Sequence, residues 1–217
     1  TTFSIDRGIY TEPFKTTVTT KTKGATIIYT LDGTIPTKSN GIKVEPINLV
    51  TEPSVEIDIN TTSRIRAIAI KQNYESTNID THSYIFPSDV LKQSRNTVPN
   101  HVNWGHAGPD FEMDPEIVNH SSPEVRPEEK DFLRVPTVSL VMDWDEMFGS
   151  SGIYIRGESV ERSTSIEYIN PNRNTEDPNS EKGFQINGTV QVVGGSSTGR
   201  WKSDKLSLRL KFDQDLR

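Results

Sequence analysis

The chain has 217 residues, which is enough for one large domain or two small ones. Hydrophobic residues make up 32% and the formal net charge is −6, so the chain lacks the basic character on which nucleic-acid binding depends. It contains no cysteine, which excludes disulfides, thiol catalysis and structural zinc ribbons. No apolar run approaches the ~20 residues of a membrane span. We therefore expect neither a nucleic-acid partner nor a membrane span.

Residues 1–86 carry the pattern of a small β domain. Segments rich in β-branched and aromatic residues alternate with turn signals such as Asp32-Gly33. These segments are TTVTT (16–20), ATIIYTL (25–31), RIRAIAI (64–70) and DTHSYIF (80–86). RIRAIAI alternates as a half-buried strand should, with Arg64 and Arg66 on the polar side. The region predicts an antiparallel β-sandwich of the immunoglobulin or fibronectin type III kind.

Residues 87–134 are richer in acids, Pro, Asn and His, and we interpret them as an acidic connector. Short helices are predicted to start at Ser88-Asp89, Asp114-Pro115 and Arg126-Pro127, because Pro is tolerated at the first helical position. Histidines and acids in this stretch fit no known metal-ligand spacing, so no metal site is predicted. They are His101, His106, His120, Asp110, Glu112 and Asp114.

Residues 135–217 return to strand signals, which makes the whole chain mainly β. The strand-like segments are VPTVSLVMD (135–143), GIYI (152–155), STSIEYI (163–169), FQINGTVQVV (184–193) and KLSLRLKF (205–212). WDEMFG (144–149) predicts a helical turn, and the polar stretch 170–183 predicts a loop. Ser139 and Ser165 have no histidine in plausible register, so no hydrolase triad is predicted.

The stretch GGSSTG (194–199) fits the opening of a phosphate-binding P-loop, but its context does not. Arg200 and Trp201 stand where Lys and Ser/Thr are required. The following run alternates basic or polar residues with Leu and Phe, which is the period of a strand rather than of a helix. The P-loop interpretation is therefore rejected.

Two interpretations of the same stretch remain open. A glycine turn before a strand with basic residues has the outline of the phosphate-covering hairpin of kinases. On that hypothesis the candidate phosphate contacts are Ser196, Ser197, Arg200, Lys205 and Arg209. The alternative is that these side chains form the solvated outer face of a hairpin.

Some aromatic residues are candidates for ligand contact. Tyr29, Tyr84 and Trp104 would stack on sugar rings if they were exposed, although the two tyrosines lie in strand patterns where core packing is more common. Trp201 follows the glycine turn and is the aromatic most suited to a planar ligand, or else it covers the base of the hairpin.

The first region resembles the chitobiase/β-hexosaminidase C-terminal-like module. The residues that carry the resemblance are PF-x3-V (13–18), IIYTLDGTIPT (27–37), PINL (46–49), IRAIAI (65–70) and SYIF (83–86). The resemblance implies a β-sandwich in which Asp32-Gly33 turns the chain between strands. The segment VTEPSVEIDINTTS (50–63) is longer than the usual spacing.

The second region resembles the start of the spore-coat protein H (CotH) kinase-like family. The matching stretches include MDPEIV (113–118), VPTVSLVMD (135–143), VERSTSIEYI (160–169), FQINGTVQVVGGSSTGRW (184–201) and KLSLRLKF (205–212). We therefore expect residues 135–217 to be the N-terminal β portion of such a domain, within a longer protein. The resemblance places the family's catalytic acids beyond Arg217, so no catalytic residue is predicted in this chain.

The two resemblances lead to two functional hypotheses. In the first, the chain belongs to a secreted or cell-envelope CotH-like protein that transfers phosphate from ATP to a protein, with Mg²⁺ or another divalent cation, and the chain alone is inactive. In the second, it is a carbohydrate-associated binding, adhesion or spacer module without phosphotransfer, whose partner is a polysaccharide surface.

Overall fold

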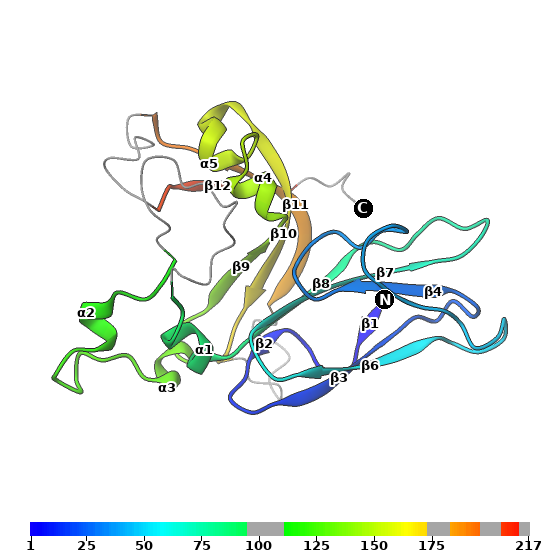
Figure 1. Ribbon diagram of the computed structural model, residues 1–217, viewed down its shortest axis with the longest axis horizontal. Helices are drawn as coiled ribbons and strands as arrows, with labels where there is room; N and C mark the ends of the chain where they lie inside the picture. Colours follow the sequence, from blue (N-terminus) through cyan, green and yellow to red (C-terminus); the bar gives the residue numbers. More distant parts are fainter. Residues whose placement is uncertain (95–110, 173–182, 196–204, 213–217) are drawn as a thin grey trace.

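The computed structural model describes residues 1–94, 111–172, 183–195 and 205–212. Three β-sheets dominate the described part, and the helices are short, so the predicted mainly-β class is confirmed. Figure 1 shows the N-terminal strands β1–β8 gathered on one side and strands β9–β12 on the other, with helices α1–α3 between them in the chain. Strand signals at both ends of the sequence thus produce two separate β units.

The N-terminal unit, which we call the module, is built from two sheets. A five-stranded sheet has the order β2-β8-β7-β4-β5, and a three-stranded sheet has the order β1-β3-β6. The strands of the larger sheet are β2 (Gly8–Ile9), β4 (Thr26–Thr30), β5 (Ile42–Val44), β7 (Ser63–Ile70) and β8 (Asp80–Ile85). The strands of the smaller sheet are β1 (Thr2–Phe3), β3 (Phe14–Thr19) and β6 (Ser54–Ile59).

The module core lies between its two sheets and is apolar. Alternate residues of β4 and β7, such as Ile27, Ile65 and Ala67, are fully buried there. Tyr84 is also fully buried, and its hydroxyl donates to the Ile5 carbonyl at 2.8 Å. This arrangement agrees with the predicted sandwich, with one difference: β2 pairs with β8 in parallel.

The turn at Asp32-Gly33 forms as the sequence predicts. Thr34 donates its backbone N–H to the Asp32 carboxylate at 3.0 Å, and Gly33 has a positive φ of 84°. A Cβ at Gly33 would come within 3.1 Å of Val141 in the second unit, so a glycine also permits the close approach of the two units here.

The segment after the module contains three short helices: α1 (Pro87–Leu91), α2 (Pro115–Val118) and α3 (Glu129–Phe132). Helix α2 begins at Pro115, as predicted, and the Asp114 carboxylate caps it by accepting the Glu116 N–H. Helix α1 begins at Pro87, one residue before the predicted start, and the helix predicted at Arg126-Pro127 begins only at Glu129. Helix α3 begins with a capping box between Glu128 and Asp131.

The second unit is a four-stranded antiparallel sheet of order β12-β11-β10-β9. Its strands are β9 (Thr137–Val141), β10 (Glu161–Ile169), β11 (Phe184–Val192) and β12 (Leu208–Lys211), with α4 (Trp144–Phe148), α5 (Ile153–Arg156) and the 3₁₀ turn η2 (Gly157–Ser159) between β9 and β10. Helix α4 confirms the predicted turn, whereas the strand predicted at GIYI is wrong. Those residues form α5 because Ile153 packs, fully buried, against Val190 and Val192 of the sheet.

The two faces of this sheet differ in chemistry. One face packs on α4 and α5 through an apolar cluster that includes Val190 and Leu208. The other face presents polar side chains toward the module, including Ser139, Ser165 and Glu167. Apart from the approach of Val141 to Gly33, the contact between the module and the second unit is therefore mainly polar, and it is the first place to look for a site.

Candidate functional site

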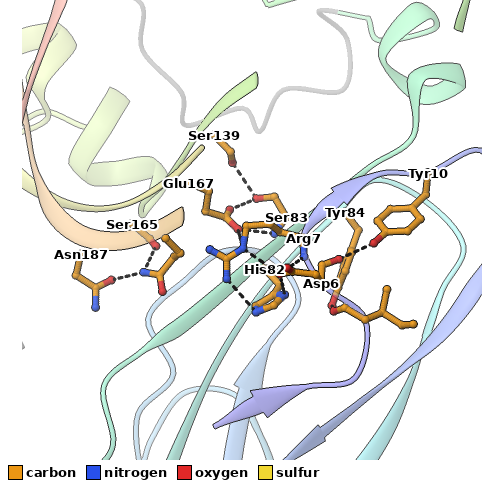
Figure 2. A network of polar contacts seen from close by, with 12 residues as sticks. Asp6, Arg7, Tyr10, His82, Ser83, Tyr84, Ser139, Ser165, Glu167 and Asn187 are labelled. Atoms are coloured by element: carbon orange, nitrogen blue, oxygen red, sulfur yellow. Dashed lines mark hydrogen bonds and ion pairs between the residues drawn. The ribbon is translucent and has the colours of Figure 1, made fainter. Parts of the chain in front are cut away.

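A buried carboxylate joins the two units. Glu167 on β10 is fully buried, and its Oε1 accepts the backbone N–H of Ser83 on β8 at 3.0 Å. Its Oε2 accepts the Ser83 hydroxyl, which also lies 2.8 Å from the hydroxyl of Ser139. Figure 2 shows Glu167 pointing out of the second sheet toward Ser83. We call the residues Arg7, His82, Ser83, Ser139 and Glu167 the junction network.

Arg7 provides the positive charge of the junction network. Its Nε lies 3.6 Å from Glu167 Oε1, and its Nη2 lies 3.1 Å from His82 Nε2. A guanidinium can only donate, so this nitrogen of His82 accepts. Burial, and then the charge of Arg7, lower the pKa of His82 to about 4. The imidazole is therefore neutral at pH 7, stacked on the ring of Phe3 with a centroid separation of 4.0 Å.

Burial raises the pKa of Glu167, while the bonds from Ser83 and the charge of Arg7 act in the opposite direction. The Ser83 hydroxyl donates to Glu167 and lies 2.8 Å from the Ser139 hydroxyl, and both Ser83 and Glu167 are buried in the contact between the units. Their hydrogen bonds therefore hold the two units together.

A pocket opens beside this network, where the turn before β8 faces β10 and β11. Its volume is about 350 Å³, and its wall includes Arg66 of the module and Asn187 of the second sheet. Asn187 donates to the Ile79 carbonyl at 3.3 Å, a second polar bond between the units. Arg66 is only 5% exposed, which corrects the prediction that its side of β7 faces solvent. We call this the junction pocket.

An exposed aromatic residue marks a larger hollow on the module. Tyr74 follows Asn73, the non-glycine residue with positive φ (65°) in the described chain, and is 66% exposed. The hollow beside it has a volume of about 510 Å³, and its wall also contains Lys38, Lys71 and Gln72. Lys71 Nζ lies 5.1 Å from the centre of the tyrosine ring and donates to the Lys23 carbonyl at 2.7 Å. We call this the Tyr74 hollow.

The candidate phosphate contacts are only partly described. Ser196, Ser197 and Arg200 lie outside the described residues, so their prediction is not tested. Lys205 and Arg209 are exposed at and near β12, a strand that confirms the strand period predicted there. Five pockets were found among the described residues, and neither Lys205 nor Arg209 lines any of them.

Of the aromatic residues considered for ligand contact, the two that the structure describes are not on the surface. Tyr29 and Tyr84 are buried in the module, which supports core packing over sugar stacking. Trp104 and Trp201 lie outside the described residues. Within the described ranges no three His, Asp or Glu side chains gather as metal ligands; His101, His106 and Asp110 lie outside those ranges.

Sequence reasoning missed Tyr74, Glu167 and the burial of Arg66. Tyr74 had a usable signal, because an aromatic residue directly after an Asn turn is placed at the tip of a connection between strands. Glu167 and Arg66 are charged residues on strands in which charged or polar residues recur at every second position. That pattern is typical of a strand side that faces solvent, and the sequence does not indicate that the other unit covers it.

None of the described helices is long and apolar enough to cross a membrane.

The comparisons with known proteins give information on the module alone. Searches found no significant match among curated proteins or solved structures. Residues 5–81, which run from the edge of the module into β8, match the family model described as chitobiase/beta-hexosaminidase C-terminal domain.

Proposed function

We propose that the chain is a carbohydrate-associated binding unit, in which the module presents a sugar-contact surface and the second sheet holds it in a fixed orientation. The Tyr74 hollow is the observation that carries this proposal. The family match over residues 5–81 supports the same class of ligand. The same resemblance supports our proposal that the protein lies outside the cell or in the cell envelope.

The chemistry of the Tyr74 hollow suits a sugar. A tyrosine offers a rigid apolar face together with a hydroxyl, and it loses little conformational entropy on binding. The surrounding wall supplies amides, hydroxyls and ammonium groups that can bond to sugar hydroxyls; they are Gln72, Asn73, Ser76, Thr26, Lys38 and Lys71. The open shape of the hollow suits a segment of a polymer lying across the surface.

The junction network explains why a binding surface is combined with a second sheet. Glu167 accepts two hydrogen bonds from Ser83 and faces the Arg7 guanidinium, so a buried polar contact holds the two units together in addition to the chain that connects them. Because the contact is fixed, the second unit would keep one orientation relative to a polymer that is bound to the module. The module thereby acts as a positioning element.

Affinity electrophoresis through gels that contain soluble chitin or cellulose derivatives tests the proposal. We expect the chain to be retarded and the Tyr74→Ala variant to lose most of the retardation. Phe212→Ala, which removes another exposed aromatic side chain (53% exposed), is the matched control and is expected to behave as the wild type. Absence of retardation for the folded wild type on every polymer, or equal retardation of Tyr74→Ala, contradicts the proposal.

A second candidate is that the chain contributes to an atypical, CotH-like kinase that uses ATP and a divalent cation. One observation favours it: an antiparallel sheet ends in a strand whose exposed side carries Arg209, with Lys205 just before it. Neither side chain lines any of the five pockets found among the described residues.

Nucleotide titration tests this second candidate. Lys205→Ala/Arg209→Ala is expected to weaken binding of a fluorescent ATP analogue in the presence of Mg²⁺ by at least tenfold. Lys43→Ala, on an exposed strand of the module, is the control and should have no effect. If the folded chain shows no saturable binding, or if the double variant binds equally well, these residues are not phosphate contacts.

A further inference from the structure

The junction pocket contains a buried guanidinium with few bonds. Arg66 is 5% exposed, yet its one protein hydrogen bond in the described chain runs from Nη1 to the Gly33 carbonyl, at 3.2 Å. Its Nε is buried and has no partner among the described residues. A guanidinium carries five N–H donors, so most of its hydrogen-bonding capacity is not used by the protein.

Other buried polar atoms near Arg66 are also unpaired. Thr81, which faces Arg66 across β7 and β8, is fully buried and its Oγ1 has no partner in the described part of the chain. Asp143 is only partly buried, but its Oδ1 is buried without a partner among the described residues, and its charge acts on Arg66. A buried polar atom without a partner is destabilising, because it has lost its bonds to water. Arg66 lines the junction pocket, so a molecule bound there can complete the hydrogen bonding of its guanidinium.

The wall of the junction pocket offers hydroxyl and amide groups from both units. Six of its residues are of this kind: Ser76, Thr77, Asn78, Ser163, Thr164 and Asn187. The side chains of Ser76, Asn78 and Ser163 make no hydrogen bond to described residues, so they are available to a ligand. Ile35 and Ile79 add apolar surface. Hydroxyls and amides beside a small apolar area match a ring with many hydroxyl groups.

The charges near Arg66 favour a neutral ligand over an anion. Asp143, Glu146 and Glu167 act on the charge of Arg66 and already supply negative charge near it, although none of the three lines the pocket. Bringing a carboxylate or phosphate into the pocket would place it near these carboxylates. A neutral ligand accepts hydrogen bonds from Arg66 without that repulsion. The volume of about 350 Å³ is within the range of small-molecule sites.

We propose that the junction pocket binds a neutral polyhydroxy compound of mono- or disaccharide size, with the Arg66 guanidinium as the central hydrogen-bond donor. The ligand would contact β7 and the turn before β8 in the module, and β10 and β11 in the second sheet. Its binding would therefore strengthen the contact between the two units. This inference rests on the carbohydrate-associated function proposed above, and it adds a second sugar site to that function.

Isothermal titration calorimetry with defined sugars tests the proposal. The neutral probes are glucose, N-acetylglucosamine, cellobiose and N,N′-diacetylchitobiose, and glucuronate is the anionic comparison. Ser163 is an exposed residue of the pocket wall, so Ser163→Trp should fill the pocket without disturbing the core. Ser54→Trp, at an exposed position on β6 of the module, is the matched control. Asn78→Ala removes one available polar group and leaves the pocket open.

We expect at least one neutral probe to bind the wild type and Ser54→Trp equally. Affinity should fall at least tenfold in Ser163→Trp and a few-fold in Asn78→Ala, and glucuronate should bind more weakly than the neutral probe. Lack of saturable binding by the folded wild type, unchanged binding by Ser163→Trp, or preference for glucuronate overturns the proposal.

The two sugar sites can be tested independently. If Tyr74→Ala abolishes polymer retardation while Ser163→Trp leaves small-sugar binding unchanged, the proposed function holds and the junction pocket is wrong. If small sugars bind in a manner that Ser163→Trp abolishes but no polymer is retarded, the junction pocket holds and the polymer surface is wrong.

Discussion

The two faces of strands β7 and β8 show how differently one sheet can be buried. On the inner face, Ile65, Ala67 and Tyr84 fill an apolar core between the two sheets of the module. On the outer face, Arg66, Thr81 and Ser83 are buried just as deeply, but against the polar face of a second sheet. The apolar face stabilises the fold without requiring exact partners, whereas the stability of the polar face depends on how many of its polar groups are matched, as Ser83 is by Glu167.

This difference predicts that the junction depends on single residues in a way that the core does not. A core site can partly relax around a lost methyl group, and the free-energy change varies with that relaxation. A buried charge cannot relax in this way, because removing one partner leaves the other uncompensated. The polar junction thus specifies one orientation of the two units, which a purely apolar contact would define less sharply.

The largest expected effect comes from removing the junction carboxylate. Glu167→Ala leaves the Ser83 N–H without its acceptor and removes the carboxylate that faces Arg7 inside the contact, and we expect a destabilisation of about 3–5 kcal/mol. Glu161→Ala is the matched control on the same strand, because Glu161 bonds to Lys211 near solvent and its loss should have little effect. Denaturant unfolding of both variants measures the difference, and equal midpoints would show that the junction is not fastened by Glu167.

A smaller effect is expected from the titration of His82. Its pKa is lowered to about 4 in the folded protein, so the unfolded chain takes up the proton first as the pH falls. The contribution of neutral His82 to the free energy of unfolding is fully present above about pH 6.5 and is lost as the pH falls toward 4. For a pKa shift of this size the loss is about 3 kcal/mol.

His82→Gln isolates this contribution, since Gln keeps an acceptor for Arg7 but does not titrate in this range. Glu167, whose pKa is raised, shifts stability in the opposite direction on acidification, and the same residue is present in both proteins. Urea unfolding between pH 7 and 4 should therefore show a steeper loss for the wild type than for His82→Gln. Parallel curves would mean that His82 is not kept neutral by its surroundings.

The sequence predicts strands correctly where apolar and polar residues alternate within a single segment. TTVTT, ATIIYTL, RIRAIAI and DTHSYIF correspond to β3, β4, β7 and β8. SVEIDI forms β6 with Val55, Ile57 and Ile59 turned inward, a strand that its alternation indicates but that the spacing of segment 50–63 alone does not predict. GIYI shows the converse, since a four-residue apolar run does not distinguish a strand from a helical turn.

The candidate site was less predictable because it depends on contacts between distant segments. Ser83 and Glu167 are 84 positions apart, and neither belongs to a motif that demands the other. Arg66 has the same local pattern whether its strand faces water or a second sheet. The assignment of residues 87–134 as a connector and 135–217 as part of a kinase-like domain stays a prediction.

Affinity electrophoresis of the wild type and Tyr74→Ala against chitin and cellulose derivatives tests the central claim most directly. The account predicts that the wild type is retarded on at least one neutral polysaccharide and that Tyr74→Ala, still folded, migrates almost as in a gel without polymer. Identical migration of the two proteins on every polymer would contradict the claim that the exposed tyrosine of the module contacts carbohydrate.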